Sequence, residues 1–299
     1  MLKLVDNISE ANCATHSGTM HADDVFSTAF LDLYLENVNL LRTTSIDPEK
    51  YPNIIVYDIG RGKLDHHQKD AKVRENGIKY CSFGLIWKEY GREYLKKINI
   101  NNYEEVFTYF DKDLVEQIDA IDNGVFPKIE SSYKVKTLFD VIKLFNPGIN
   151  SNQDMNEQFI KAETIAKEII KQEIINCIGK VETQNKINKY LENNTNNYLI
   201  LDEYLPYEEF ILSSELGNNI VFVIYPSTRG GYCIKTVPKS VKDHTARMDF
   251  PKSWGGLENE DLEKESGIKD ITFCHTGLFI VSCKTKTAAI EVVNKLLGE

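Results

Sequence analysis

The chain has 299 residues, of which 42% are hydrophobic and 27% charged, a composition typical of globular proteins and unlike that of disordered or collagenous chains. Its formal net charge of −10 argues against a general binder of duplex nucleic acid, because such affinity comes mainly from Lys and Arg. No apolar run approaches the roughly 20 residues that span a bilayer, and the N-terminus lacks the features of a secretory signal. With six scattered cysteines and no CxxC spacing, we expect reduced thiols, a cytoplasmic protein and no membrane partner.

The first half of the chain alternates between predicted strands and helices. Apolar residues recur at helical spacing from Ala22 to Leu35, after a short first strand that ends at 12–15 and a polar turn. The further predicted elements of this half are strands at 40–45 and 54–56 and helices at 83–98 and 104–121. Asn123-Gly124 supplies a C-terminal stop for the last of these helices. The alternation indicates an α/β domain with a mostly parallel sheet over residues 1–150.

The second half of the chain has a different pattern. After a turn signal at Asn146-Pro147-Gly148, Ile, Ala and Val recur at helical spacing, so we predict a helical connector and possible interface over 151–195. The Asn-rich stretch 193–197 is predicted to be a loop. A smaller α+β domain over 196–299 follows from strands predicted at 198–201, 220–225, 232–237, 271–274 and 279–283 and an amphipathic helix at 285–297.

Histidines and aspartates gather at the predicted strand ends of the first domain. The segment His16–Asp24 lies at a strand-to-helix junction, which in an α/β sheet is the edge where ligands normally bind. Asp58 ends a later strand, and the loop after it presents Asp65-His66-His67. The candidate metal ligands are His16, His21, Asp23, Asp24, Asp58, His66, Asp119 and Asp122. Imidazole mixed with carboxylate suits Mn²⁺, Zn²⁺ or Fe, and the set is large enough for two ions that share a carboxylate.

Each of these residues also has an ordinary structural interpretation. A single Asp or His near a turn is usually a helix cap or a solvated side chain. Asp23 or Asp24 alone would favour the start of the following helix. An Asp-His-His triplet is nevertheless rare in a chain with six histidines, and its combination with the strand-terminal Asp58 favours a metal site.

Several short motifs stand out along nearly the whole chain. They are His16–Asp24, Tyr57–Gly60, Asp65–Gln68, Phe83–Trp87, Ile118–Gly124, Phe145–Pro147, Pro226–Gly231, Trp254–Leu257 and Phe273–Gly277. The set resembles the motifs of the Myg (melanocyte proliferating gene) family, which belongs to the DHH phosphoesterase superfamily named for its Asp-His-His motif. The chain departs from the family pattern at Met20, Tyr232 and Leu278, where Phe, Trp and Gly are expected.

The resemblance implies a DHH-type N-terminal domain that holds two divalent ions, commonly Mn²⁺, and a C-terminal domain that closes over the substrate. His16 and Asp24 would then be ligands of the first motif. His21 or Asp23 would fill the remaining place. Asp58 would bridge the two ions.

The same resemblance distributes roles among the later motifs. His66 would bind the second ion. Asp122 would be the ligand of the fourth motif, with Asp119 as its alternative. His67 would contact the substrate phosphate, and we count it with Asp65 among the catalytic residues.

The second domain offers a candidate substrate site. Arg229-Gly230-Gly231 could present a guanidinium and backbone N–H groups to a phosphate, although a hairpin turn beside a solvated basic loop would have the same sequence pattern. His275 is by default a half-buried structural histidine, but the resemblance assigns it, like Arg229, to the catalytic and substrate-binding residues. Trp254 is either a stacking surface for a base or a core residue.

Two classes of function are compatible with these residues. One is a two-metal phosphodiester hydrolase, and the resemblance implies a 3′–5′ exonuclease on RNA or short oligonucleotides. A hydrolase of small nucleotides or pyrophosphates is its variant, so the expected partner is a short oligonucleotide or a phosphorylated small molecule. The other class is a non-enzymatic regulatory protein that retains a metal site. The sequence is compatible with an oligomer and does not specify one.

Overall fold

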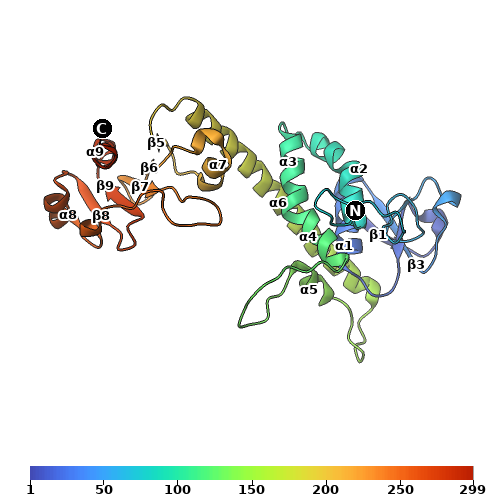
Figure 1. Cartoon of the computed structure of the whole chain (residues 1–299). Coiled ribbons are helices and arrows are strands. Elements are labelled where there is room, and N and C mark those ends of the chain that lie inside the picture. Colours follow the sequence, from blue (N-terminus) through green and yellow to red (C-terminus); the bar gives the residue numbers. More distant parts are fainter. Residues whose placement is uncertain (299) are drawn as a thin grey trace. The chain divides into compact units, whose positions relative to one another are not determined.

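The computed structural model describes residues 1–298 and forms two compact units, Met1–Gly179 and a second unit that begins at Lys180 (Figure 1). The division falls within α6 (Met155–Glu192), a single long helix in the range where a connector is predicted. The other elements of the first unit are β1 (Leu2–Val5), β2 (Cys13–His16), α1 (Ala22–Tyr34), β3 (Val38–Thr43), β4 (Ile55–Val56), α2 (Ser82–Lys97), α3 (Tyr103–Phe110), α4 (Glu116–Asp122) and α5 (Leu138–Lys143).

The first unit is built on a four-stranded parallel sheet with the strand order β1-β3-β2-β4. The predicted α/β class and parallel sheet are therefore confirmed. All four carboxyl ends face one edge, and the register pairs Cys13 with Ile55 and Ala14 with Val56. Two residues further along each strand, the same register places His16 beside Asp58, so the register alone makes them neighbours.

Helix α1 is the central helix of this unit, because its first ten residues, Ala22 to Leu31, are all buried. Four of them are polar, including Asp23 and Asp24. Burying a charged side chain costs free energy unless it has a hydrogen-bond, ion-pair or metal partner. Aromatic rings fix the helix against its neighbours: Phe26 lies 5.6 Å from Phe83 and Phe30 lies 5.4 Å from Trp87, measured between ring centroids. In Figure 1 helices α1 to α4 gather beside the blue strands.

One prediction for the first unit was wrong, and a second was incomplete. The strand predicted to be the first is the second, β2, because β1 precedes it at the edge of the sheet and pairs only with β3. The single helix predicted over 104–121 is divided into α3 and α4 by a π-helical turn, Asp111–Val115. The predicted stop is confirmed, since α4 ends at Asp122 and Gly124 adopts a left-handed φ of 76°.

The second unit is a five-stranded mixed sheet with the order β5-β6-β7-β9-β8. Only β5 and β6 pair in parallel, and the other neighbours are antiparallel. Its elements are β5 (Tyr198–Ile200), α7 (Glu208–Ser213), β6 (Phe222–Pro226), β7 (Tyr232–Thr236), α8 (Asn259–Ser266), β8 (Ile271–Cys274), β9 (Ile280–Cys283) and α9 (Lys286–Leu297). The predicted strands and closing helix are present, whereas the short helices α7 and α8 had no clear periodic signal.

One face of this sheet packs on the core of the second unit. Ile224, Ile234 and Val281 point into it, and α9 covers it after an N-cap at Thr285, whose Oγ1 accepts a hydrogen bond from Ala288 N–H at 3.1 Å. Trp254 is 4% exposed within the same core, so of its two interpretations the structure supports the core residue. Within residues 1–298, no helix combines the length and apolar character needed to cross a bilayer.

Candidate metal centre

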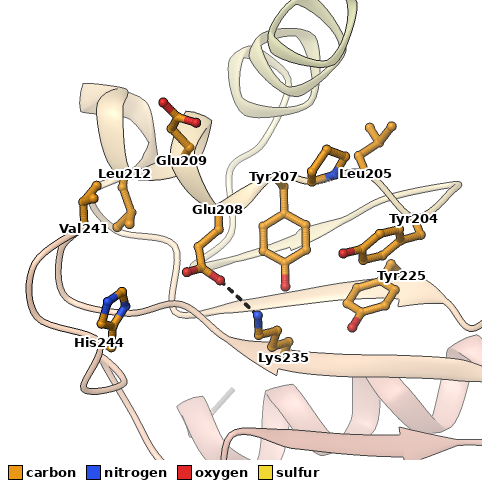
Figure 2. A pocket seen from close by; sticks show the side chains of 11 residues that line it. Tyr204, Leu205, Tyr207, Glu208, Glu209, Leu212, Tyr225, Lys235, Val241 and His244 are labelled. Carbon is orange, nitrogen blue, oxygen red and sulfur yellow. Dashed lines mark hydrogen bonds and ion pairs between the residues drawn. The ribbon is translucent and has the colours of Figure 1, made fainter. Parts of the chain in front are cut away.

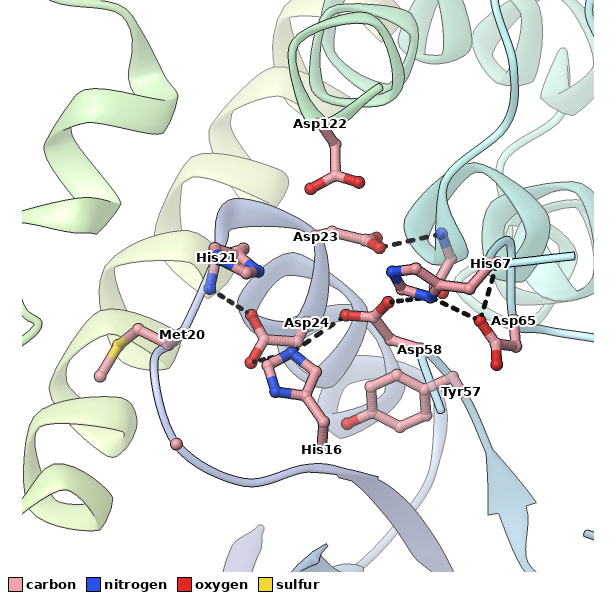
Figure 3. Close-up of polar contacts among 12 residues, drawn as sticks. His16, Met20, His21, Asp23, Asp24, Tyr57, Asp58, Asp65, His67 and Asp122 are labelled. Carbon is pink, nitrogen blue, oxygen red and sulfur yellow. Dashed lines mark hydrogen bonds and ion pairs between the residues drawn. The ribbon is translucent and has the colours of Figure 1, made fainter. Parts of the chain in front are cut away.

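The candidate centre begins where β2 and β4 end. β2 closes with His16, and Asp58 follows β4 with a left-handed φ of 56°, a conformation uncommon for a residue with a side chain. His16 Nε2 lies 3.2 Å from Asp58 Oδ2. Figure 3 shows the Asp58 carboxylate between His16 on one side and the His67 loop on the other. The backbone conformation at Asp58 thus presents one carboxylate to two sets of side chains.

Two aspartates enter from the first turn of α1. Asp24 Oδ1 accepts a hydrogen bond from the backbone N–H of His21 at 2.7 Å, and its Oδ2 lies 3.5 Å from His16 Nε2. Asp23 is held by the N-terminus of α2, where the N–H groups of Ser82 and Phe83 donate to it at 3.1 and 2.6 Å. Helix N-termini stabilise carboxylates, so Asp23 is fixed in place by α2.

His66 joins the second side of Asp58. Its side chain is 8% exposed and its Nε2 faces three carboxylates, Asp58 at 3.2 Å, Asp122 at 3.4 Å and Asp23 at 3.5 Å. Around Asp58 and His66, three groups have ligand atoms close enough to hold one ion: His16–Asp24–Asp58, Asp58–His66–His67 and Asp23–His66–Asp122. Asp58 belongs to two of these groups, as does His66. This is the arrangement expected when a carboxylate is shared between two neighbouring cation sites.

The spacing and the hydrogen-bonding state of these groups fit bound cations. Two ligand atoms that bind one ion at roughly 2.0–2.2 Å lie about 3 to 3.6 Å apart. The imidazole-to-carboxylate distances at His16 and His66 fall between 3.2 and 3.5 Å. Asp24 Oδ2 is buried without a hydrogen-bond partner among the described residues. A buried oxygen without a partner is costly, and a divalent cation would satisfy it.

The charges of the cluster shift the pKa values of its members. Burial disfavours protonated imidazole, but the hydrogen bond to Asp58 outweighs it and raises the pKa of both His16 and His66 to about 9. Burial opposes ionisation of Asp58, yet the two imidazoles lower the pKa of that carboxyl to about 2. Burial raises the pKa of Asp24 to about 7 and that of Asp23 well above its usual range. When no cation is bound, these groups therefore retain protons that a cation would displace.

His67 differs from its neighbour His66. Its side chain is 61% exposed, and its Nδ1 lies 2.8 Å from Asp65 Oδ1 but 3.7 Å from Asp58 Oδ1. Asp65 is itself fixed by the N–H groups of Arg61 and His67, at 2.6 and 3.1 Å. Asp65 thus orients the His67 ring, and the ring faces the cavity rather than a dense set of carboxylates.

The structure separates the two competing aspartates of α4. Asp122 lies among the ligand groups, whereas Asp119 belongs to none of those found among residues 1–298. Arg74 Nε donates to Asp119 Oδ2 at 2.8 Å, and Cys81 N–H donates to its Oδ1 at 2.9 Å. The carboxylate packs so closely on Gly84 that a Cβ there would lie 2.3 Å from Asp119 Oδ2. Asp119 supports the α2–α4 contact, and Asp122 faces the candidate ions.

Arg74 explains the π turn between α3 and α4. It also binds Asp111 with both terminal nitrogens, at 2.5 and 2.9 Å. Asp111 and Asp119 are eight residues apart, which on a continuous α-helix places them about 80° apart around the axis. A π turn absorbs one residue and reduces this angle to about 20°, so both carboxylates reach one guanidinium. No sequence pattern pointed to Arg74.

His21 lines the cavity of the centre but joins none of its ligand groups within residues 1–298. Its ring stacks 6.3 Å from Phe139, measured between centroids. The cavity has a volume of about 650 Å³ and is lined by His16, His21, Asp58, His66, His67, Asp122, Asn123 and Phe139. Between the alternatives left open at the first motif, the structure favours Asp23 over His21 as the further ligand.

The turn before His21 is fixed by a residue that was not singled out as functional. Asn146 Oδ1 accepts from Met20 N–H and Asn146 Nδ2 donates to Met20 O, both at 2.8 Å. Arg42 Nη2 donates to Gly18 O at 2.9 Å in the same turn. Asn146 stood out in the sequence only as part of the Phe145–Pro147 motif. That motif was explained by the preference of Asn-Pro-Gly for turns, so no functional role was assigned to Asn146.

The candidate substrate residues of the second unit lie at two places. Arg229-Gly230-Gly231 forms the turn between β6 and β7, where the chain approaches so closely that a Cβ at Gly231 would lie 2.3 Å from Cys283 O. His275 follows β8, and its Nδ1 accepts a hydrogen bond from Gly277 N–H at 2.9 Å. Because β7 begins opposite Cys283 while His275 N–H bonds Ile280 O, the two places lie at opposite ends of β9, about 10 Å apart.

Fold and site together define an α/β protein with a His and Asp cluster, able to hold metal ions, at the carboxyl edge of a parallel sheet. The family model MYG1_exonuc, described as Uncharacterised protein family (UPF0160), matches residues 12–297. The chain belongs to this family.

Relatives with the same family name match almost the whole chain. It is similar to a "MYG1 protein" of Dictyostelium discoideum, with 26% identity over 323 residues and 98% of each chain covered. It is 28% identical to "MYG1 exonuclease" of Mus musculus over 320 residues, covering 95% of this chain and 84% of the relative. The human "MYG1 exonuclease" is also 28% identical, with 95% and 85% covered. No solved structure matches significantly.

Proposed function

We propose that this protein is a divalent-metal-dependent phosphodiester hydrolase that removes nucleotides from the 3′ end of RNA or short oligonucleotides. Several relatives carry the name exonuclease, which supports hydrolysis of a nucleic-acid strand. The observation that carries the proposal is Asp58, whose two oxygens face two ligand groups, Oδ2 toward His16 and Oδ1 toward His66. A shared carboxylate is the feature that a pair of catalytic ions requires.

The ligand groups fit two ions, for which Mn²⁺ is our choice because the donors mix imidazole and carboxylate. His16 and Asp24 would hold one ion. His66, Asp23 and Asp122 would hold the other, and Asp58 would contact both. Bound at these positions, the ions would supply a nucleophile from water and neutralise charge on the phosphoryl oxygens. Such a site also agrees with the DHH-type catalytic domain that the sequence resemblance implies.

The remaining side chains of the cavity determine what the site does with a substrate. His67, oriented by Asp65, is exposed to the cavity and can donate a hydrogen bond to a phosphate oxygen or transfer a proton to a leaving oxygen. The chain is acidic overall, with 45 acidic and 35 basic residues. Acidic surface disfavours long polyanions, so we propose short single strands as substrates.

Hydrolysis by the purified, Mn²⁺-loaded chain tests the proposal. One arm measures cleavage of bis-p-nitrophenyl phosphate, and the other uses RNA and DNA oligomers of graded length, each labelled at the 5′ or the 3′ end. Stepwise shortening of 5′-labelled strands supports 3′–5′ exonuclease action. Cleavage restricted to mononucleotides or pyrophosphates would favour a small-nucleotide hydrolase, and no hydrolysis of any substrate would favour a regulatory role.

His66 and His67, although adjacent, should respond differently to substitution. His66→Ala should lower bound metal per chain, because its Nε2 faces three carboxylates and is nearly buried. His67→Ala should leave metal content near that of the parent chain while lowering turnover, because its ring is exposed and held by Asp65. Elemental analysis and steady-state kinetics measure the two effects. Equal loss of metal from both variants would refute this division of roles.

Stabilisation by Mn²⁺ should increase with pH. In the metal-free protein the pKa values of His16 and His66 are raised to about 9, above their ordinary 6.5. The stability that comes from protonating these rings is complete below pH 6.5 and is lost as the pH rises through 9. Mn²⁺ must displace the same protons, so competition between protons and Mn²⁺ for these rings weakens as the pH rises from 6.5 to 9. The rise in Tm on adding Mn²⁺ should be larger at pH 8.5 than at pH 6.5, and an equal rise at both values would contradict the ligand assignment.

Arg229 and His275 are proposed to bind substrate phosphates from the second unit. Arg229→Lys keeps the charge but loses bidentate contact, and His275→Ala loses a donor. We expect each to lower kcat/KM about tenfold, equivalent to about 1.4 kcal/mol, without changing metal content. Since the two positions lie at opposite ends of β9, their effects should multiply in the double variant. Parent-like kinetics in both single variants on a short oligonucleotide would show that neither contacts the substrate.

A further inference from the structure

The second unit contains a cavity, separate from the metal centre, that the proposed chemistry does not use. Its volume is about 580 Å³, within the range of about 300–1,000 Å³ that small-molecule sites occupy. It lies on the face of the sheet opposite the core, because Tyr225 and Lys235 alternate with the core residues Ile224 and Ile234. The segment Tyr204–Glu209 covers it from the other side, as Figure 2 shows.

Three tyrosines form the aromatic part of this cavity. Tyr225 packs between the other two, with ring centroids 5.3 Å from Tyr204 and 6.0 Å from Tyr207. Tyr225 and Tyr207 are 8% and 3% exposed, so these rings are firmly held. Tyr204 is 58% exposed although it belongs to the same aromatic group. A rigid aromatic cluster with one open ring offers a platform on which a flat ligand can stack.

The polar groups of the cavity are incompletely satisfied. The Tyr207 hydroxyl is buried without a hydrogen-bond partner among the described residues, and in Figure 2 it points toward the sheet beside Lys235 and Tyr225. Lys235 Nζ lies 3.0 Å from Glu208 Oε2, and both side chains are more than a third exposed. A donor and an acceptor therefore stand side by side next to an unpaired hydroxyl. This pattern matches the polar edge of a heterocyclic base.

We propose that this cavity binds a nucleobase of the oligonucleotide strand, an inference that rests on the proposed function. Tyr204 stacks on the base, while Tyr207 and the Lys235–Glu208 pair contact its edge. A phosphate fits the cavity poorly, because Glu208 and Glu209 outnumber the one Lys. The second unit thus contributes a contact that is specific for a base rather than for charge.

The test measures binding without turnover, in EDTA, by fluorescence anisotropy with the full chain. The probes are a labelled six-nucleotide oligoadenylate and an abasic strand with the same number of phosphates. Tyr204→Ala should weaken binding of the oligoadenylate by about tenfold, whereas Tyr204→Phe should keep it, because the ring carries the stacking. Tyr207→Phe should weaken it without removing a ring. Tyr51→Ala, which removes an exposed tyrosine of the first unit, is the matched control and should change nothing.

The base-binding subsite and the proposed function can fail separately. Equal affinity of the Tyr204→Ala variant and the parent chain, equal affinity for the two strands, or no binding of oligoadenylate by the parent chain would each overturn the subsite. Hydrolysis of bis-p-nitrophenyl phosphate by the parent chain involves no nucleobase and tests the proposed function alone. Base binding with no hydrolysis of any phosphodiester would therefore support the subsite while refuting the exonuclease.

Discussion

Asp58→Asn should abolish most of the hydrolytic activity while leaving the chain folded. The substitution removes the one carboxylate that belongs to both the His16 and the His66 ligand groups, so both cation sites lose a ligand charge together. We expect bound Mn²⁺ per chain to fall and kcat to decrease at least about 10³-fold, equivalent to about 4 kcal/mol. Elemental analysis of the purified variant and hydrolysis of bis-p-nitrophenyl phosphate measure these two effects.

Asparagine is the right replacement because of the backbone at this position. Asp58 has a φ of 56°, which Asn adopts readily and which would strain Ala. Loss of activity in Asp58→Asn then reflects the missing charge rather than a distorted turn. Asp6→Asn, at an exposed aspartate of the same unit, is the matched control and should keep both metal and rate. A variant at Asp58 with the metal content and rate of the parent chain would rule out the shared-carboxylate centre.

The edge of the sheet that carries the site could be predicted from the sequence. Apolar periodicity located α1 and β3, and parallel strands necessarily bring their carboxyl ends to one edge. His16 and Asp58 each follow such a strand, so their proximity follows from topology alone. The loop with Asp65-His66-His67 begins at the same edge, so its return to that edge was also a reasonable expectation. Local rules were therefore sufficient for the ligands that lie next to strand ends.

The distinction between Asp119 and Asp122 could not be predicted in this way. It depends on which side of α4 each aspartate faces, and the π turn rotates these sides by about one residue. It depends also on Arg74, which lies 45 positions before Asp119 in the chain. Likewise, the opposite placement of Arg229 and His275 follows from the antiparallel register of β7 and β9. Helix phase and strand register are set by contacts between distant residues, to which short motifs are insensitive.

Removing the guanidinium of Arg74 should cause a large loss of stability in the first unit. Arg74 is 9% exposed and pairs with Asp111 and with Asp119, whose carboxylate is completely buried. Arg74→Met keeps much of the volume but leaves a buried charge without a cationic partner, which costs about 3–5 kcal/mol. For a unit of this size that lowers Tm by about 10 °C. Thermal unfolding followed by circular dichroism at pH 7 measures the change.

We attribute the loss of stability in Arg74→Met to the unpaired charge on Asp119, and a second substitution tests this cause. Burial raises the pKa of Asp119 to about 6 even with Arg74 present, so without Arg74 the carboxyl binds a proton more readily still. A carboxyl with a raised pKa stabilises the fold when protonated, and that stability is lost as the pH rises through its pKa. The defect of Arg74→Met should therefore shrink between pH 7 and pH 5, and adding Asp119→Asn should restore much of the stability at pH 7. Asp119→Asn alone should keep its metal whereas Asp122→Asn loses it, and the reverse result would make Asp119 the ligand.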